Sequence, residues 1–453
     1  MENLENTIVA ISTTLGNGGI SIIRMSGKNA VNIASKVFFT KNTKVENFTP
    51  RYMYLGTFKY EDISDKCMCV YFKSPFSFTG EDIIEFHCHG GITLTNKIYE
   101  SLVACGCSPA GKGEFSKRAF LNGKLTLDEA EGIIDIINAE SESELKVGYQ
   151  LMQGELKNKI TILQNNLTEL LAKIEVTLDY PEEDLEEETT TNIKNTLIKT
   201  KEEINKLLDT ATFGKSIKDG TKIIIFGKTN AGKSSLLNSL LSYNRAIVTN
   251  IQGTTRDTLE EIFIYKGYKF ILIDTAGIRE SNDLVESIGI QKSKDMLNYA
   301  DIVLFVIDGS ENLTQDDFDI SKTLSDKNTI LVINKSDLKR VAEINKLPFT
   351  KTIELSTLTG SNINNLKEMI LSEVTSKNIN NNSFVITNSR HIESLKESLA
   401  HLDNALLGLD NLIQLDLISI DIKNCWISLG NITGNSDNEK IIDDIFSKFC
   451  VGK

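Results

Sequence analysis

The octapeptide GKTNAGKS (227–234) decides the fold of the central part of this chain. It follows the apolar run KIIIF and precedes SLLNSLL, which has helical spacing, so a strand, a loop and a helix succeed one another. In that context the pattern is typical of a phosphate-binding loop, in which Gly227 and Gly232 let backbone N–H groups converge on the phosphates of a nucleotide. Lys233 adds a positive charge there, and the hydroxyl of Ser234 is placed for Mg²⁺.

Strand-like and helical runs alternate from about residue 217 to residue 377. The strand-like runs lie in YKFILIDTAG, DIVLFVIDGS, NTILVINKSD and KTIELST. Such alternation predicts a doubly wound, mostly parallel sheet, with ligands bound at the carboxyl ends of its strands. We therefore expect a P-loop α/β domain at residues 217–377.

Two motifs of this domain indicate that the base is guanine. In NKSD (334–337), Asp337 can accept both the ring N–H and the exocyclic amine of guanine, a pair of donors that adenine lacks. Asn334 is expected to hold that loop and to face the edge of the base. The sequence ELST (354–357) is a candidate fifth element of the same site.

Two more motifs supply candidates for the phosphates and the metal. DTAG places Asp274 at a strand end, where it can hold Mg²⁺ through water, and Gly277 where its N–H can meet a γ-phosphate. GTTRD supplies Thr254 and Thr255 as candidate metal and phosphate contacts. These motifs in this order predict a GTPase.

The motifs do not identify the residue that orients the attacking water. Ras-like GTPases place a glutamine directly after D-x-x-G to orient the attacking water, whereas this chain has Ile278 there. From the residues alone, Glu286 is better interpreted as a solvated helix residue. Arg256 and Arg279 are candidates for stabilising charge, or surface residues.

Length and composition limit the class of protein. A chain of 453 residues predicts two to four domains, and 40% hydrophobic with 25% charged residues is ordinary for a soluble globular protein. The net charge of −13 argues against a broad basic surface for nucleic acid. With no apparent signal peptide and no run of eighteen apolar residues, we expect a cytoplasmic protein without a membrane span.

The flanks of the central domain differ from it. Residues 1–120 read as short strands punctuated by glycine, which predicts a small α+β domain. Residues 121–216 and 378–453 have helical periodicity, and we expect both segments to pack into one bundle because neither can bury its apolar face alone. One expected helix face consists of Leu156, Ile160, Leu163, Leu167, Leu170 and Ile174.

The seven cysteines have no C-x-x-C spacing, which favours free thiols in a reducing compartment. The stretch HCHGG suggests a metal site at first. In a strand, however, His87 and His89 share one face and Cys88 lies on the other. Since no third group of ligands is apparent in the sequence, we do not expect a zinc site.

The motifs resemble one family closely, the tRNA-modification GTPase MnmE, also called TrmE. The resemblance includes TIVAIST with GNGGISIIRMSG, SFTGEDIIEFHCHGG, GEFSKRAFLNGKL, GKTNAGKSSLLN, AIVTNIQGTTRD, DTAGIRE and the terminal FCVGK. These stretches cover both ends and the centre of the chain in order. The family implies an N-terminal domain that binds a tetrahydrofolate and forms a homodimer, a helical domain made from both flanks, and an inserted GTPase domain.

The resemblance also implies how GTP is hydrolysed. Family members use K⁺ and dimerisation of their GTPase domains, and Glu286 matches the family's water-orienting glutamate, which explains Ile278. The implied K⁺ ligands are Asn230, Thr249, Ile251 and Thr254, and the expected Mg²⁺ ligands are Ser234, Thr255 and Asp274. The GTP site is expected to comprise Asn230, Ala231, Gly232, Lys233, Ser234, Ser235, Thr249, Thr254, Thr255, Asp274, Thr275, Gly277, Asn334, Lys335, Asp337 and Ser356.

The implied overall reaction is carboxymethylaminomethylation at carbon 5 of the wobble uridine of certain tRNAs. It requires a flavoprotein partner, MnmG (also called GidA), with FAD and NADH, in a heterotetramer. A tetrahydrofolate derivative, in its 5,10-methylene or 5-formyl form, supplies the one-carbon unit. The residues that match the family's folate site are Arg24, Glu85, Arg118, Asn122, Lys124 and Lys453, each of which could instead be structural.

The terminal FCVGK resembles a prenylation motif only in the position of its cysteine. With the family resemblance, Cys450 is a candidate nucleophile or acid–base group for the uracil ring, or a thiol held for docking of the tail. Two residues depart from the family pattern: Lys112 precedes GEFSKRAF, and Asn435 stands where an acidic residue is common.

Two other functions remain open on the residues alone. The chain could be a regulatory GTPase of ribosome assembly without covalent chemistry, since the GTPase motifs are shared. The first 120 residues distinguish this alternative, because an assembly factor is expected to carry an RNA-binding module with a basic face there. The chain could also be a folate-dependent one-carbon enzyme that its GTPase domain regulates, which folate binding without dependence on tRNA would favour.

Overall fold

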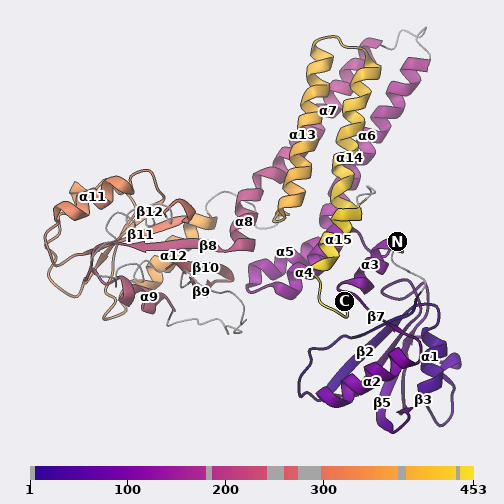
Figure 1. Ribbon diagram of the computed structural model, residues 1–453. Coiled ribbons are helices and arrows are strands. Elements are labelled where there is room, and N and C mark those ends of the chain that lie inside the picture. The colour runs from indigo at the N-terminus through magenta and orange to yellow at the C-terminus, as the bar shows by residue number, and fades with distance from the viewer. Residues whose placement is uncertain (1–5, 180–185, 242–259, 274–296, 376–383, 435–438) are drawn as a thin grey trace, which may run out of the picture. The chain divides into compact units, whose positions relative to one another are not determined.

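A computed structural model describes residues 6–179, 186–241, 260–273, 297–375, 384–434 and 439–453 (Figure 1). The chain forms two compact units. The first consists of Met1–Ile137, Gly148–Thr200 and Lys396–Lys453, and the second of Asn138–Val147 and Lys201–Leu395. Among the described residues, no helix is both long and apolar enough to cross a membrane.

The first unit begins with a seven-stranded sheet of order β3-β4-β5-β6-β2-β1-β7, antiparallel except for the pair β1 and β7. Alternation of side chains divides its faces: Ile23 and Met25 of β2 face the core, and Arg24 faces the other way. The helices α1 (Ala30–Val37) and α2 (Ile92–Ala104) share that core. The strands are β1 (Ile8–Ile11), β2 (Ile20–Ser26), β3 (Phe38–Phe39), β4 (Met53–Tyr60), β5 (Ile63–Phe72), β6 (Ile83–His89) and β7 (Ser108–Pro109).

Long helices from both flanks complete this unit. The buried residues of α6 (Glu155–Asp179) include all six apolar positions predicted for its face, which confirms that prediction. α6 packs against α14 (Leu415–Thr433), and Gln164 Nε2 donates to the backbone oxygen of Trp426 at 3.1 Å. The other helices with residues in this unit are α3 (Glu114–Leu121), α4 (Leu127–Asn138), α5 (Glu142–Met152), α7 (Glu186–Asp209), α13 (Ser389–Asp410) and α15 (Glu439–Ser447), of which α4, α5, α7 and α13 have their remaining residues in the second unit.

The second unit contains a six-stranded sheet of order β13-β12-β11-β8-β10-β9, parallel except where β9 meets β10. The prediction of a doubly wound, mostly parallel sheet is therefore confirmed. Ile223 and Ile225 face one apolar cluster and Ile224 the opposite one, so β8 is buried on both sides. The strands are β8 (Thr221–Phe226), β9 (Glu260–Tyr265), β10 (Tyr268–Ile273), β11 (Ile302–Asp308), β12 (Thr329–Asn334) and β13 (Thr352–Glu354).

Helices cover both faces of this sheet. α9 (Lys233–Leu241) and α12 (Ile363–Thr375) pack on one face, and α11 (Gln315–Thr323) packs on the other. α8 (Ala211–Asp219) leads into β8. Because β8, β11 and β12 are parallel neighbours, their carboxyl ends bring the loops after Phe226, Asp308 and Asn334 to one edge.

Candidate functional site

The phosphate-binding loop follows β8 and leads into α9, as the sequence predicts. Gly227 and Gly232 have φ angles of 147° and 95°, and Asn230 has a φ of 65°. A Cβ on Gly227 would lie 2.2 Å from the oxygen of Val306, and one on Gly232 would lie 2.0 Å from Nδ2 of Asn334. Glycine is therefore required at both places for backbone conformation and for space.

The start of α9 is arranged to receive phosphate. Lys233 is its first residue, and Nζ of Lys233 donates to the backbone oxygen of Lys228 at 2.5 Å. Ser234 and Ser235 are exposed in the first turn of the helix. Backbone N–H groups and the positive end of the helix dipole meet there, which suits an anion, and an exposed Ser234 hydroxyl suits an accompanying Mg²⁺.

Asn334 joins two loops of the site. It ends β12 and is 1% exposed. Its Nδ2 donates to the oxygen of Ala231 at 3.0 Å, and its Oδ1 accepts from the N–H of Thr357 at 3.1 Å. The side chain therefore connects the phosphate-binding loop to the loop after β13, which agrees with its expected role in holding the site together.

The candidate base-recognition residues lie next to this connection. The hydroxyl of Ser356, which is 1% exposed, donates to Oδ1 of Asp337. This hydrogen bond orients the carboxylate, as recognition of two guanine donors requires. The two motifs NKSD and ELST are thus brought together as the sequence predicts.

Lys335 forms an ion pair with Asp308, at the end of β11. Burial opposes ionisation of Asp308, but hydrogen bonds from Lys335 and Ser310 outweigh burial and lower the pKa of this carboxyl. The same hydrogen bond raises the pKa of Lys335. Asp308 was missed by the sequence analysis, although its place at the carboxyl end of a parallel strand was a usable signal.

Part of the predicted GTP site lies outside the described residues. This part includes the candidate catalytic residue Glu286 and Ile278. It also includes Thr249, Ile251, Thr254, Thr255, Arg256, Asp274, Thr275, Gly277 and Arg279. Asn435, which departs from the family pattern near the C-terminus and is not part of this site, lies outside the described residues as well.

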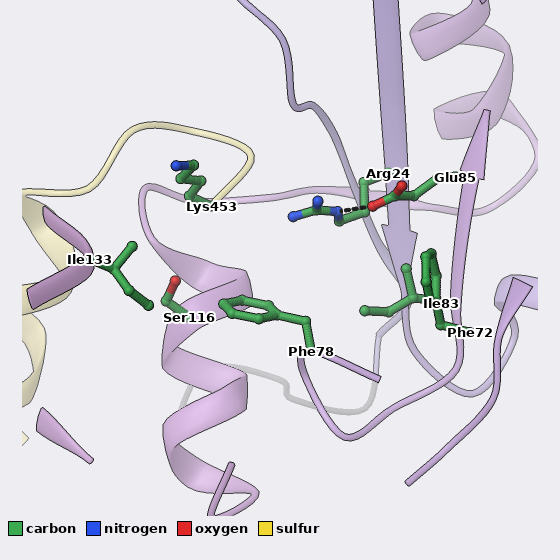
Figure 2. Close-up of a pocket in the computed structure, with 8 residues that line it drawn as sticks. All are labelled: Arg24, Phe72, Phe78, Ile83, Glu85, Ser116, Ile133 and Lys453. Atoms are coloured by element: carbon green, nitrogen blue, oxygen red, sulfur yellow. Dashed lines mark hydrogen bonds and ion pairs between the residues drawn. The ribbon is translucent and has the colours of Figure 1, made fainter. Parts of the chain in front are cut away.

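A second candidate site lies in the first unit (Figure 2). A cavity of about 320 Å³ is lined by Arg24, Phe72, Phe78, Ile83, Glu85, Ser116, Ile133 and Lys453. Its volume is at the lower end of the range of small-molecule pockets, roughly 300–1,000 Å³. Aromatic rings and three charged groups line one cavity, and Arg24, Glu85 and Lys453 had been predicted to share a folate site.

Register explains the central pair of this cavity. Arg24 of β2 lies directly opposite Glu85 of β6, on the face away from α1 and α2, and Arg24 Nε donates to Glu85 Oε1 at 2.6 Å. Burial opposes ionisation of Glu85, but the hydrogen bonds from His87 and Arg24 outweigh burial and hold the pKa of Glu85 below its usual value. The cavity therefore contains a fixed carboxylate and a fixed guanidinium.

The C-terminal tail reaches this cavity through Lys453. The Gly113 N–H donates to the Cys450 oxygen at 3.4 Å, and Lys112 pairs with Val451 in an antiparallel bridge. Gly452 has a φ of 96°, and a Cβ there would lie 2.5 Å from the oxygen of Ile11. The tail thus docks along its backbone, while Cys450 itself is exposed.

The other three predicted folate residues are not among those that line the cavity. Arg118 is 1% exposed and forms ion pairs with Glu81 at 3.2 Å and Glu114 at 2.8 Å. Asn122 Nδ2 donates to the oxygen of Thr79 at 2.7 Å, and Lys124 packs beside Gly80. Their contacts hold the turn at residues 79–81 against α3.

The HCHGG stretch has a structural explanation. Cys88 is buried between the strands, whereas His87 is partly exposed and His89 exposed. Contrary to the expectation of no further ligands, Asp65 and Cys67 approach Cys88 with ligand atoms within 4.8 Å of one another. His89 donates its backbone N–H to Asp65 at 3.1 Å and places Nδ1 2.6 Å from it.

These thiols belong to the apolar core of the sheet. A hydrogen bond with Cys67, followed by burial, raises the pKa of Cys88. The raised pKa keeps the thiol of Cys88 neutral, which makes it a poor metal ligand, and both oxygens of Asp65 already interact with His89. Core packing therefore accounts for this group.

Comparison with known proteins identifies the family of this chain. Residues 127–450 match the family model described as the MnmE helical domain, and residues 7–124 match that described as the GTP-binding protein TrmE N-terminus. The first match alone spans more than half of the chain.

Full-length relatives are named after the same family as these two models. The tRNA modification GTPase MnmE of Clostridioides difficile strain 630 is 42% identical over 99% of this chain and 100% of its own length. That of Desulforamulus reducens strain MI-1 is 44% identical over 99% of this chain and 100% of its own. The solved G domain of the T. maritima FeoB iron transporter is 26% identical, covers 35% of this chain and 98% of that chain, and has a TM-score of 0.25. With family models and full-length relatives in agreement, this chain belongs to the MnmE family of tRNA modification GTPases.

Proposed function

We propose that this chain binds and hydrolyses GTP as one component of a tRNA-modifying complex. The observation that carries the proposal is the junction at Asn334, which holds the phosphate-binding loop beside the oriented Asp337 carboxylate. The first element suits a triphosphate, and the second suits guanine. Membership in the MnmE family supplies the link to tRNA.

Base recognition can be tested by changing one atom of Asp337. In Asp337→Asn, an amide N–H₂ replaces one acceptor oxygen, so the exocyclic amine of guanine meets a donor, whereas xanthine offers a carbonyl there. We expect hydrolysis of GTP to fall by at least about a hundredfold and hydrolysis of xanthosine triphosphate to appear, since two charge-assisted hydrogen bonds of about 1.5–3 kcal/mol each are affected. Unchanged preference for GTP would refute this role of Asp337.

We propose that hydrolysis uses Mg²⁺, K⁺ and the carboxylate of Glu286. Ser234, Thr255 and Asp274 are the proposed Mg²⁺ ligands, and Asn230, Thr249, Ile251 and Thr254 are the proposed K⁺ ligands. A monovalent cation beside the β- and γ-phosphates would stabilise the charge that develops there. Equal rates of GTP hydrolysis in K⁺ and Na⁺ would refute the role of K⁺. An unchanged kcat in Glu286→Gln would refute the role of Glu286 in hydrolysis.

The finer reaction is proposed as carboxymethylaminomethylation at carbon 5 of the tRNA wobble uridine, in the cytoplasm, with a flavoprotein partner of the MnmG type that supplies FAD and NADH. The test is nucleoside mass spectrometry of bulk tRNA from a strain that lacks this gene. Loss of the carbon-5 modification, restored by the wild-type gene but not by Asp337→Asn, is the expected result. Persistence of the modification would contradict the proposal and favour a regulatory GTPase.

We propose that the cavity of Arg24, Glu85 and Lys453 holds a tetrahydrofolate derivative. Its aromatic lining suits a pterin ring, and the basic side chains suit a glutamate tail. Arg118, Asn122 and Lys124 would affect folate binding indirectly, by holding the turn at residues 79–81. Calorimetric titration with 5-formyltetrahydrofolate should show binding that Arg24→Met abolishes, and equal binding to both proteins would contradict it.

The domain boundaries at residues 120, 216 and 377 remain predictions, as does the homodimer through the N-terminal domain. Light scattering of the purified chain tests the dimer, because a homodimer doubles the scattering mass of a 50.4 kDa chain. A mass that stays at that of one chain across the concentration range would contradict it.

A further inference from the structure

Lys228 is the second residue of the phosphate-binding loop, at a position that the motif leaves unspecified. Its ammonium group contacts two other side chains. Nζ of Lys228 lies 2.6 Å from Oδ2 of Asp317 and donates to Oγ1 of Thr314 at 2.6 Å. Both partners belong to the start of α11, more than eighty positions along the chain.

The carboxylate that receives Lys228 is built into the protein. The Asp317 side chain is 3% exposed, whereas that of Lys228 is 27% exposed. Oδ2 of Asp317 also accepts from the backbone N–H of Thr314 at 2.8 Å, in a capping box at the start of α11. A buried carboxylate with fixed partners is a rigid anchor, because an uncompensated charge there would be costly.

The backbone of Lys228 takes part in the site as well. Its carbonyl oxygen accepts from Nζ of Lys233, the lysine expected at the β- and γ-phosphates. Three residues further along the loop, the oxygen of Ala231 accepts from Asn334. The loop is therefore attached to the fold at two points, through the Lys228 side chain before its apex and through Asn334 after it.

We propose that Lys228 is a positioning residue for nucleotide binding, which latches the phosphate-binding loop to Asp317 and Thr314 at the start of α11. The proposal rests on the GTP site described above and goes beyond its motif residues. A loop held in its binding conformation loses less conformational entropy when the phosphates arrive. The latch thus favours binding, while the γ-phosphate chemistry belongs to other residues.

The test uses the full chain and four variants. Lys228→Met removes the charge, and Lys228→Arg retains it and can still reach a carboxylate. Lys322→Met is the matched control, because Lys322 likewise pairs with an aspartate of α11. That pair, with Asp319 at 3.8 Å, lies within the helix, and its side chains are 77% and 60% exposed. Lys233→Ala reports on the GTP site itself. Nucleotide affinity is measured with fluorescent mant-GDP and a mant-labelled non-hydrolysable GTP analogue. KM and kcat are then measured by steady-state GTP hydrolysis.

For Lys228→Met we expect Kd for both probes and KM for GTP to rise about tenfold, equivalent to about 1.4 kcal/mol. We expect kcat at saturating GTP to stay within about twofold, since the latch acts on binding. Lys228→Arg and Lys322→Met should bind as wild type. A split between KM and kcat, with rescue by arginine, is a result that loss of folding would not produce.

The latch is refuted if wild type binds the probes and Lys228→Met binds them equally well, or if Lys322→Met weakens binding as much. A fall in kcat with unchanged KM also refutes it. If wild type fails to bind, or Lys233→Ala binds as tightly as wild type, the GTP site itself is wrong and the latch falls with it. These outcomes separate failure of the latch from failure of the proposed function.

Discussion

Replacement of Asn334 by alanine should uncouple the phosphate-binding loop from the loop after β13. The change removes two hydrogen bonds, from Nδ2 to Ala231 at 3.0 Å and from Thr357 to Oδ1 at 3.1 Å. Asn334 is 1% exposed, so water cannot replace them without local opening. A buried polar group left without its partner costs about 1–3 kcal/mol, which gives about 2–6 kcal/mol for both groups as an upper range.

Hydrogen exchange measured by mass spectrometry is the direct assay. The N–H of Thr357 should exchange faster by about tenfold to a hundredfold, since about 1.4 kcal/mol corresponds to each tenfold change in an opening equilibrium. The affinity for mant-GDP should fall in the same variant, because Ala231 lies in the phosphate-binding loop. Peptides from α6 provide the control, since α6 belongs to the first unit.

The fluorescence of Trp426 gives a second control. It is the only tryptophan of the chain and lies on α14 in the first unit, so urea unfolding followed by its emission should be the same in Asn334→Ala and wild type. Unchanged exchange at Thr357 together with unchanged nucleotide affinity would refute the role assigned to Asn334. A shift of the Trp426 transition as large as the change at Thr357 would show a global effect instead.

Three further predictions concern the first unit. The pKa of Glu85 is depressed in the folded state, so its contribution to the free energy of unfolding is present above its unfolded pKa and is lost as pH falls through the folded value. Glu85→Gln should remove this acid dependence from urea unfolding followed by Trp426 fluorescence. An unchanged pH profile of the free energy of unfolding would contradict this prediction. Gly452→Ala places a Cβ 2.5 Å from a carbonyl of β1, so the tail should detach and the Gly113 N–H, which donates to the Cys450 oxygen, should exchange faster with solvent; an equal exchange rate would contradict docking. Leu167→Ala, at a fully buried position of α6, should lower the free energy of unfolding by about 2–5 kcal/mol in the same fluorescence assay, and a loss below about 1 kcal/mol would contradict tight packing there.

Features that depend on local spacing were predictable from the sequence. GKTNAGKS after a strand indicated the phosphate-binding loop, and β8, the loop and α9 follow in that order. The apolar residues of α6 recur every three or four positions, so its buried face could be derived in advance. Asn334 and Asp337 were identified because they occupy fixed positions of one short motif.

Pairings between distant residues were not predictable. Arg24 meets Glu85 because of the register of β2 and β6, and a shift of one residue would turn one of the two side chains to the core face. Arg118 matched a binding motif, yet the structure places it in buried ion pairs with Glu81 and Glu114. A motif shows that a basic side chain is present at this position. Only the burial of that side chain and its ion-pair partners show whether it contacts a ligand or stabilises the fold.

The sequence by itself determined the class of this protein: an α/β nucleotide-binding domain between helical segments, a preference for guanine, and the family. It could do so because periodicity and short motifs are properties of neighbouring residues. The tertiary structure decided how Lys228 meets Asp317, how Asn334 joins two loops, and how the tail reaches the cavity at Arg24. Those contacts join residues far apart in the chain, and their geometry follows from strand order, register and packing.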